Sequence, residues 1–312
     1  MTVKTKDHFN ALLSGLKGTA LFNEPMSKHT SFRIGGPADA MVFPSDETEL
    51  SCIIKKARSE RIPLFVLGEG TNILVRDKGM KGIVISLASR MAGDCFRNIV
   101  TVREDADWSF IYAGAGVALS RLLNFTVQKG LSGLEFVVGI PGSLGGAVIM
   151  NAGSYGKEMK DVLETVRIID RTGNINDLPA KEILFQYRCA HIHGVAVAGA
   201  VLKLKKSDQS KIKAAISNNL LLKKDSQPLN KPNAGSIFKN PERTAAWKLI
   251  DSIGMRGAKA GGAIVSEKHT NFIVNNGTAN ARDVISLIRQ IGSRVEKEKG
   301  ITLELEVRIV GK

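Results

Sequence analysis

A chain of 312 residues, 43% of them hydrophobic and 24% charged, is long enough for about two or three domains with cores of their own, and its composition excludes a disordered or fibrous protein. Its 44 Lys and Arg outnumber 30 Asp and Glu, so the formal net charge is +14 and nucleic acid is a partner to consider. However, the basic residues are spread along the chain, aromatic residues make up only 5%, and no helix-turn-helix, zinc or RNP motif is present. We therefore favour a basic protein that handles anionic small molecules.

The cysteines and the apolar runs bound the setting in which the protein works. Cys52, Cys95 and Cys189 are odd in number and far apart, so they support neither a disulfide framework nor a CxxC metal site. No apolar run approaches the roughly 18 residues of a membrane span. We expect a monomer in the reducing cytoplasm that holds no metal ion and binds neither nucleic acid nor a membrane.

The first part of the chain alternates between strand and helix patterns. A strand pattern at 40–43 is followed by Ser45 and Asp46, which are typical helix-start residues, and then by an apolar stripe at helical spacing. Apolar runs at 64–67 and 73–75 predict two strands on either side of a glycine-rich turn. Further β-type blocks lie at 83–85, 99–102 and 110–113.

The second part mixes the same two patterns. An apolar face from Leu119 to Val127 predicts a helix that leads into the most glycine-rich stretch of the chain, and strands are predicted at 166–169 and 195–204. Helical periodicity returns at 205–224, and we place a domain boundary before it. The remaining expected elements are a helix at 245–250, a strand at 272–274, a helix at 281–299 and a last strand at 303–310. The fold class expected from this order is α+β.

Two glycine-rich stretches are candidates for ligand binding, and we call residues 68–72 the first glycine segment and residues 139–156 the second. Glycine allows left-handed dihedrals and leaves backbone N–H groups uncovered, so such a backbone can wrap a phosphate, and two of them suggest a pyrophosphate. Neither has the GxGxxG fingerprint with an acidic residue about 20 positions on, and no Walker lysine is present. Tight turns in a β-rich domain explain the glycines equally well.

Three polar residues occupy places where chemistry is possible. Arg188 follows an apolar lead and could hold a carboxylate through two hydrogen bonds, although a structural arginine paired with an acid is the commoner case. Ser236 lies in Asn-Ala-Gly-Ser, where small neighbours let a ligand approach the hydroxyl, and the alternative is a turn or cap serine. Glu306 alternates with apolar neighbours, and the alternative is an outward-facing strand acid. Taken singly, each structural alternative is favoured.

The order of motifs changes this balance, because from about residue 30 to residue 311 the chain resembles the UDP-N-acetylenolpyruvoylglucosamine reductase family. Seven blocks in the same order make the resemblance highly specific. They are Thr-Ser-Phe-Arg-Ile-Gly-Gly-Pro-Ala (30–38), Gly-x-Gly-Thr-Asn (68–72), Ile-Pro-Gly-Ser-x-Gly-Gly-Ala (140–147), Met-Asn-Ala-Gly-x-Tyr-Gly (150–156), Phe-x-Tyr-Arg (185–188), Ala-Gly-Ser-x-Phe-Lys-Asn-Pro (234–241) and Glu-Val-Arg (306–308).

The resemblance implies an FAD-binding domain of the vanillyl-alcohol-oxidase (PCMH) type in two α+β subdomains, residues 1–81 and 82–204, followed by an α+β substrate-binding domain at 205–312. It also implies that NADPH reduces FAD, after which the flavin passes hydride to the enolpyruvyl methylene carbon of the UDP-sugar. By the same resemblance, Arg188 and Glu306 polarise the substrate carboxylate and Ser236 protonates the α carbon. Glu306 then has to be protonated or share a proton, so we expect an environment that raises its pKa.

The resemblance further assigns the binding residues. Those expected near the substrate are Tyr187, Lys239, Asn240 and His269, and for the histidine a capping or core role is an equal possibility. Those expected to bind FAD are Gly68, Gly70, Thr71, Asn72, Gly139, Ile140, Pro141, Gly142, Ser143, Gly145, Gly146, Ala147, Asn151 and Gly153.

Some residues depart from the family pattern. Glu69 stands where the family usually has glycine, and a glutamate near a pyrophosphate is unfavourable unless its side chain points away. Tyr187 is the last tyrosine of the chain, so we expect the class that lacks a tyrosine-bearing loop over the substrate, with an open channel. The alternatives that remain are an FAD oxidase of the same fold that uses oxygen and, less favoured, a basic nucleic-acid-binding protein.

Overall fold

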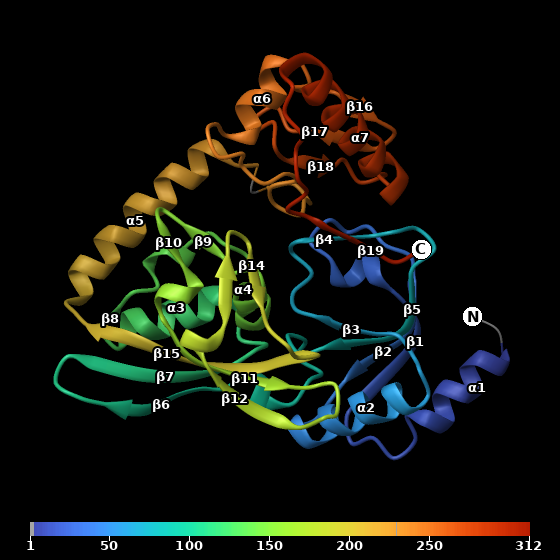
Figure 1. Cartoon of the computed structure of the whole chain (residues 1–312), viewed down its shortest axis with the longest axis vertical. Coiled ribbons are helices and arrows are strands. Elements are labelled where there is room, and N and C mark those ends of the chain that lie inside the picture. Colours follow the sequence, from blue (N-terminus) through green and yellow to red (C-terminus); the bar gives the residue numbers. More distant parts are fainter. Residues whose placement is uncertain (1–2, 229) are drawn as a thin grey trace. The chain divides into compact units, whose positions relative to one another are not determined.

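The computed structural model describes residues 3–228 and 230–312 (Figure 1). Their contacts group them into two compact units. The first unit takes in the described residues of Met1–Asn23, Asp39–Glu69 and Gly82–Leu222, and the second those of Glu24–Ala38, Gly70–Lys81 and Lys223–Lys312. Each unit is therefore assembled from three separate stretches of chain, and the first glycine segment passes from one unit to the other between Glu69 and Gly70.

The N-terminal part of the first unit contains a four-stranded sheet. Its strand order is β1 (Thr19–Pro25), β2 (Pro37–Phe43), β5 (Met80–Ser86) and β3 (Leu64–Leu67), and β3 pairs with β5 in parallel. Helix α2 (Glu47–Ser59) begins where the sequence predicted it, because the side chain of Asp46 accepts a hydrogen bond from the Glu49 backbone N–H at 2.7 Å. The expected strand, helix and strand are confirmed here. A preceding helix, α1, spans Val3–Leu12.

The larger sheet of the first unit has six strands and is antiparallel along its main path. The order is β12 (Ile175–Pro179), β11 (Leu163–Ile169), β15 (Ala196–Lys206), β7 (Trp108–Gly114) and β6 (Ile99–Glu104), with β8 (Leu131–Ser132) also pairing with β15. Helices α3 (Leu119–Gln128) and α5 (Gln209–Ser226) agree with the apolar periodicities that predicted them. The 3₁₀ turns of the described chain lie at Met26–His29, Asp94–Arg97, Glu135–Val137, Met159–Asp161 and Ala180–Glu182.

The second glycine segment is more ordered than a glycine-rich loop. It contains the short helix α4 (Leu144–Ile149) and the first strand of the hairpin β9 (Gly153–Ser154) and β10 (Lys157–Glu158). The buried side chains of α4 are Leu144, Ala147 and Val148, which have helical spacing that the surrounding glycines obscured. A nearby hairpin is formed by β13 (Leu184–Gln186) and β14 (Cys189–His191).

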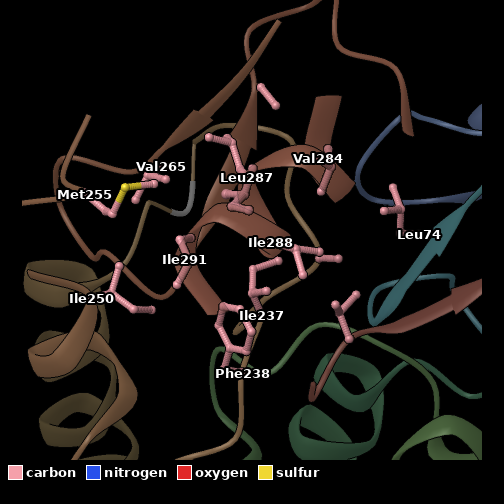
Figure 2. Close-up of a cluster of buried hydrophobic side chains, with 14 of the residues drawn as sticks. Leu74, Ile237, Phe238, Ile250, Met255, Val265, Val284, Leu287, Ile288 and Ile291 are labelled. Carbon is pink, nitrogen blue, oxygen red and sulfur yellow. The ribbon is translucent and has the colours of Figure 1, made fainter. Parts of the chain in front are cut away.

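A single apolar cluster forms the core of the second unit (Figure 2). Helix α7 (Ala281–Lys299) contributes the face that its sequence predicted, and side chains from α6 (Ala246–Ser252) and from residues 234–238 pack with it. The labelled members in the figure are Leu74, Ile237, Phe238, Ile250, Met255, Val265, Val284, Leu287, Ile288 and Ile291. The strands of this unit are β16 (Lys259–Ala260), β17 (Ala263–Val265), β18 (Ile273–Asn275), β4 (Ile73–Val75) and β19 (Arg308–Val310).

Residues 70–81 belong to the second unit because they supply both apolar and polar contacts to it. Leu74 is fully buried in the cluster of Figure 2, and β4 pairs with β19 in parallel. The carboxylate of Asp77 accepts hydrogen bonds from the backbone N–H groups of Ala281 at 2.8 Å and Arg282 at 3.2 Å, so it caps the start of α7. None of these contacts is local in sequence.

The expected last strand at 303–310 is wrong in its first part, because only β19 is a regular strand. The backbone changes partner along this stretch. Lys239 N–H donates to the carbonyl oxygen of Glu304 at 2.8 Å, whereas Arg308 N–H donates to that of Asn72 at 3.0 Å. Each pairing is therefore too short to extend over the whole segment.

Candidate active site

In the first unit, the start of the first glycine segment lies against the second glycine segment. A Cβ atom at Gly68 would fall 2.7 Å from the Ser143 hydroxyl oxygen, so only glycine fits there without a shift. The carboxylate of Glu69 accepts a hydrogen bond from the backbone N–H of Gly142. The structure thus brings together Gly68, Gly142 and Ser143, three of the residues that the sequence assigned to the cofactor.

Ser143 carries an unused hydrogen-bonding group. Its side chain is 1% exposed, and among the described residues its hydroxyl oxygen has no hydrogen-bond partner. Burying a hydroxyl without a partner is unfavourable, so such an atom points to a ligand. Together with Gly139 and Gly142, whose φ angles of 67° and 130° favour glycine, this hydroxyl fits a cofactor that brings its own polar atoms.

Glu69 departs from the family pattern, and its carboxyl group is partly buried against the backbone of Gly142. Although the residue is exposed overall, partial burial of the carboxyl group raises its pKa, and the hydrogen bond from Gly142 only partly opposes this shift. The protonated form is therefore more accessible than for a glutamate in water.

Several predicted cofactor glycines have a structural explanation within the protein. A Cβ atom at Gly145 would lie 2.8 Å from that of Ala115, and a Cβ atom at Gly153 would lie 2.4 Å from the carbonyl oxygen of Lys157. These two positions require glycine because chain segments approach each other closely. Their residue type is thus no argument for or against contact with FAD.

In the second unit, Gly70 has a φ angle of 63°, and a Cβ atom there would lie 2.1 Å from the carbonyl oxygen of His29. This turn sets the position of Asn72, whose side-chain Nδ2 donates to the backbone carbonyl oxygen of Glu306 at 3.1 Å. A residue predicted to bind the cofactor thereby also holds the backbone of a residue predicted to be catalytic.

Ser236 and Glu306 are brought together by pairing of their two segments. The backbone N–H of Glu306 donates to the carbonyl oxygen of Ile237 at 2.8 Å, and Phe238 forms an isolated bridge with Leu305. Ile237 and Phe238 are buried in the apolar cluster of Figure 2, whereas Ser236 and Glu306 remain partly exposed. The segments that carry these two residues, which are 70 positions apart in sequence, are therefore paired through their backbones, and neither residue is fully buried.

Arg188 lies in the first unit, at a two-residue turn. Gln186 pairs with Cys189 across the β13–β14 hairpin, so Tyr187 and Arg188 form its loop. Arg188 has a φ angle of 59°, which costs a residue with a side chain about 1–2 kcal/mol. Its guanidinium carbon lies 4.7 Å from the ring centroid of Tyr187, which is 43% exposed. Such strain is often found at functional sites.

Lys239 and Asn240 both make contacts within the second unit. The Lys239 ammonium group is 3.0 Å from a carboxylate oxygen of Glu304. The Asn240 side-chain oxygen accepts a hydrogen bond from the Ala246 backbone N–H at 3.0 Å, at the start of α6. Each residue thus has a structural contact, and the substrate role that the resemblance implies stays a prediction.

His269 is partly buried between two aromatic rings, with ring centroids 4.9 Å from Phe272 and 6.2 Å from Trp247. Its Nδ1 atom is buried and has no hydrogen-bond partner among the described residues. Burial lowers its pKa, and the positive charge of Arg256 acts in the same direction. A hydrogen bond with its own backbone opposes this shift only in part, so the neutral form is favoured more than for a histidine in water, and Nδ1 presents an unused nitrogen.

Sequence reasoning missed Asn271, which is 2% exposed. Its side chain accepts a hydrogen bond from the Phe238 backbone N–H at 3.0 Å and donates to the carbonyl oxygen of the same residue at 2.8 Å. This double contact fixes the segment that carries Ser236. No local pattern could reveal it, because the partner lies 33 positions away.

Comparison with known proteins places this geometry in a class. Residues 38–178 match the FAD binding domain family, and residues 227–310 match the C-terminal domain of UDP-N-acetylenolpyruvoylglucosamine reductase. The first match covers most of the first unit, including the contacts of Gly68 with Ser143 and of Glu69 with Gly142. The chain is therefore a flavoprotein with an α+β FAD-binding domain, as the sequence predicted.

Whole-chain relatives narrow the class. The UDP-N-acetylenolpyruvoylglucosamine reductase of Syntrophus aciditrophicus is 42% identical over 301 residues, which is 96% of this chain and 95% of that protein. That of Heliobacterium modesticaldum is 43% identical over 298 residues, covering 95% and 92%. The crystal structure of the Thermus caldophilus enzyme matches with a TM-score of 0.79 and 34% identity, covering 95% of this chain and all of that one.

This chain belongs to the UDP-N-acetylenolpyruvoylglucosamine reductase family. It is an oxidoreductase of peptidoglycan precursor synthesis, with FAD as its cofactor and NADPH as its reductant. Family membership decides against the oxidase and nucleic-acid-binding alternatives. In the described part of the chain, no helix is long and apolar enough to cross a membrane.

Proposed function

We propose that Arg188, Glu306 and Ser236 are the catalytic residues of this reductase. FAD, when bound, supplies the two electrons and one of the two hydrogens that saturate the enolpyruvyl double bond. The observation that supports the proposal is the pairing of the Ile237 and Glu306 backbones, which joins the segment of Ser236 to that of Glu306 in the second unit. The roles below follow from the charge that develops during this reaction.

Addition of hydride at the methylene carbon leaves negative charge on the α carbon and its carboxylate. An enzyme accelerates such a step by placing positive charge and hydrogen-bond donors where that charge develops. Arg188 binds the substrate carboxylate through its guanidinium group, and Glu306 stabilises the same group when it carries or shares a proton. Ser236 then gives its hydroxyl proton to the α carbon, so its O–H bond breaks as the new C–H bond forms, and the hydroxyl regains a proton from solvent.

The cofactor residues are proposed on the fit of the two glycine segments. The unpartnered Ser143 hydroxyl and the uncovered backbone around Gly139 and Gly142 support a polar, phosphate-bearing ligand in the first unit. Gly70, Thr71 and Asn72, which belong to the second unit, are proposed as FAD-binding residues on the family resemblance. We propose residues 1–81 and 82–204 as the two FAD-binding subdomains and residues 205–312 as the substrate domain, with residues 24–38 and 70–81 of the first subdomain packing in the same compact unit as the C-terminal core.

Substrate contacts are proposed for Tyr187, Lys239, Asn240 and His269. The exposed ring of Tyr187 lies beside Arg188, and the unused Nδ1 atom of His269 offers a hydrogen-bonding group in the second unit. We further propose that the enzyme is a cytoplasmic monomer of the class without a tyrosine-bearing loop. The three cysteines support the proposed cytoplasmic location, since all are free thiols, as expected in a reducing compartment.

The Ser236→Ala variant tests the mechanism by separating the two half-reactions under anaerobic conditions. Bleaching of the flavin by NADPH should proceed at the wild-type rate. Recovery of the flavin absorbance on adding the enolpyruvyl substrate should slow by about 10²–10⁴-fold, because a general acid has been removed.

A matched control is Ser252→Ala, since the Ser252 hydroxyl donates to the Leu249 carbonyl oxygen at 2.9 Å within its own helix. Both half-reactions of this variant should match those of the wild type. Equal slowing of the two half-reactions in the Ser236 variant would contradict the proposed role.

A further inference from the structure

Asn151 stands at an unusual place in the second glycine segment. It follows the end of α4, it is fully buried, and its φ angle is 39°. A buried amide has to satisfy two N–H donors and an oxygen acceptor within the protein. The strained backbone adds a cost that other contacts must offset.

The side chain of Asn151 is fully used as a donor by the protein itself. Its Nδ2 donates to a carboxylate oxygen of Glu158 at 2.9 Å and to the backbone carbonyl oxygen of Gln186 at 3.1 Å. Its Oδ1 accepts a hydrogen bond from the Lys160 backbone N–H at 3.1 Å. Glu158 is itself fixed, since it lies 3.0 Å from the Lys160 ammonium group.

The hydrogen-bond partners of the Asn151 side chain indicate its role. Since both N–H groups are taken, the side-chain amide has no donor left for the cofactor. Gln186 is the last residue of β13, directly before the turn of Tyr187 and Arg188. A hydrogen bond at its carbonyl oxygen therefore fixes the end of the strand from which the strained arginine projects.

We infer that Asn151 is a positioning residue for Arg188, in place of the FAD contact that the resemblance implied for this residue. It connects the segment that binds the cofactor to the turn that carries the guanidinium group, and both belong to the first unit. Since the inference rests on the proposed role of Arg188, its test includes that residue. Loss of the amide displaces the guanidinium group while leaving Ser143 and the glycine backbone in place.

The test compares the two half-reactions of Asn151→Gly, a change that the positive φ angle tolerates. The flavin content of the purified enzyme and the rate of its bleaching by NADPH should equal those of the wild type. Anaerobic reoxidation by the enolpyruvyl substrate should slow by about 10–100-fold, the range expected when a catalytic group shifts by roughly 1 Å. Loss of flavin, or equal slowing of both half-reactions, would overturn the inference.

A double-mutant cycle with Arg188→Ala identifies the residue through which Asn151 acts. If Asn151 acts by positioning Arg188, removing it in the Arg188→Ala background should slow reoxidation no further. Additive effects would overturn the inference. A fully active Arg188→Ala enzyme would instead refute the proposed function, so the two failures are distinguishable.

A second pair of variants covers the case in which Asn151→Gly fails to fold. Asn151→Asp places a carboxylate against Glu158 and removes both donors, so it should slow reoxidation at least as much. Adding Glu158→Gln removes the charge repulsion but leaves the Gln186 carbonyl oxygen without its donor, so reoxidation in the double variant should stay slow. Full recovery in the double variant would count against the inference.

Discussion

The two parts of the proposed catalytic set are held by different kinds of structure. Ser236 and Glu306 project from backbone segments that pair with each other and are anchored by Ile237 and Phe238 in the apolar cluster of Figure 2. Arg188 projects from a short hairpin turn with a positive φ angle, and one contact at the end of the strand before it comes from the buried amide of Asn151. The segment of Ser236 is thus anchored in an apolar core, whereas the turn of Arg188 is held by strand pairing and polar contacts.

This difference predicts how each part responds to substitution. Burial of a large apolar side chain stabilises by about 1.5–3 kcal/mol, and several such residues hold the segment of Ser236. A single hydrogen bond contributes about 0.5–1.5 kcal/mol net. Damage to the second unit should therefore appear mainly as lost stability, whereas damage near Arg188 should appear mainly as lost activity in a folded protein.

Among the variants that test this comparison, the largest expected effect on activity is that of a substitution at Arg188. Arg188→Gly removes the guanidinium group but relieves the strain of the positive φ angle, so activity should fall by about 10²–10³-fold while the thermal unfolding temperature stays level or rises slightly. Stopped-flow reoxidation of the flavin and thermal melting measure the two quantities.

Arg188→Lys keeps the charge and the strain, and serves as the comparison for this variant. It should melt like the wild type and retain more activity than the glycine variant, since the fork geometry is lost but the charge is kept. A large loss of stability in Arg188→Gly would show that the turn is held by the arginine itself.

Ile237→Ala tests the other part of the comparison. The side chain is fully buried, so its truncation should destabilise the protein by about 2–5 kcal/mol. Activity at low temperature, measured on the fraction that remains folded, should fall far less than in Arg188→Gly. Urea unfolding followed by fluorescence gives the stability. A folded but inactive Ile237→Ala variant would mean that activity is as sensitive to the position of Ser236 as to that of Arg188.

The smallest expected effect concerns Glu69, at the contact between the glycine segments. Because burial raises its pKa above the ordinary value of 4.5, folding favours the protonated form. The stabilisation from this group is full below the unfolded-state pKa and is lost as the pH rises through the folded-state pKa. Glu69→Gln should remove this pH dependence from the melting temperature of the apoprotein.

The same variant should bind FAD about two- to tenfold more tightly at neutral pH, because a negative charge near an anionic ligand has been removed. Gln can still accept the hydrogen bond from Gly142, so the contact between the segments is kept. Titration with FAD, followed by flavin fluorescence, measures the affinity. Weaker binding by Glu69→Gln would show that the carboxylate helps to hold the site.

The elements that follow from short-range patterns could be predicted from the sequence. The apolar face of α7, the Asp46 cap of α2 and the strands on either side of the first glycine segment all occur where the periodicity and residue types placed them. The order of seven motifs likewise predicted the family, since such motifs are local. Pairs of residues within a few positions of each other carry this information.

Tertiary structure alone decided which distant segments belong to the same unit. It also decided which polar side chains form their hydrogen bonds within the protein. Residues 70–81 join the C-terminal core, the stretch before β19 changes partner, and the Asn151 amide turns to Gln186. Each outcome depends on a partner that lies tens to hundreds of positions away, and neither periodicity nor residue type specifies that partner. Sequence thus determined the elements and the family, while long-range pairing determined how the proposed catalytic residues are held.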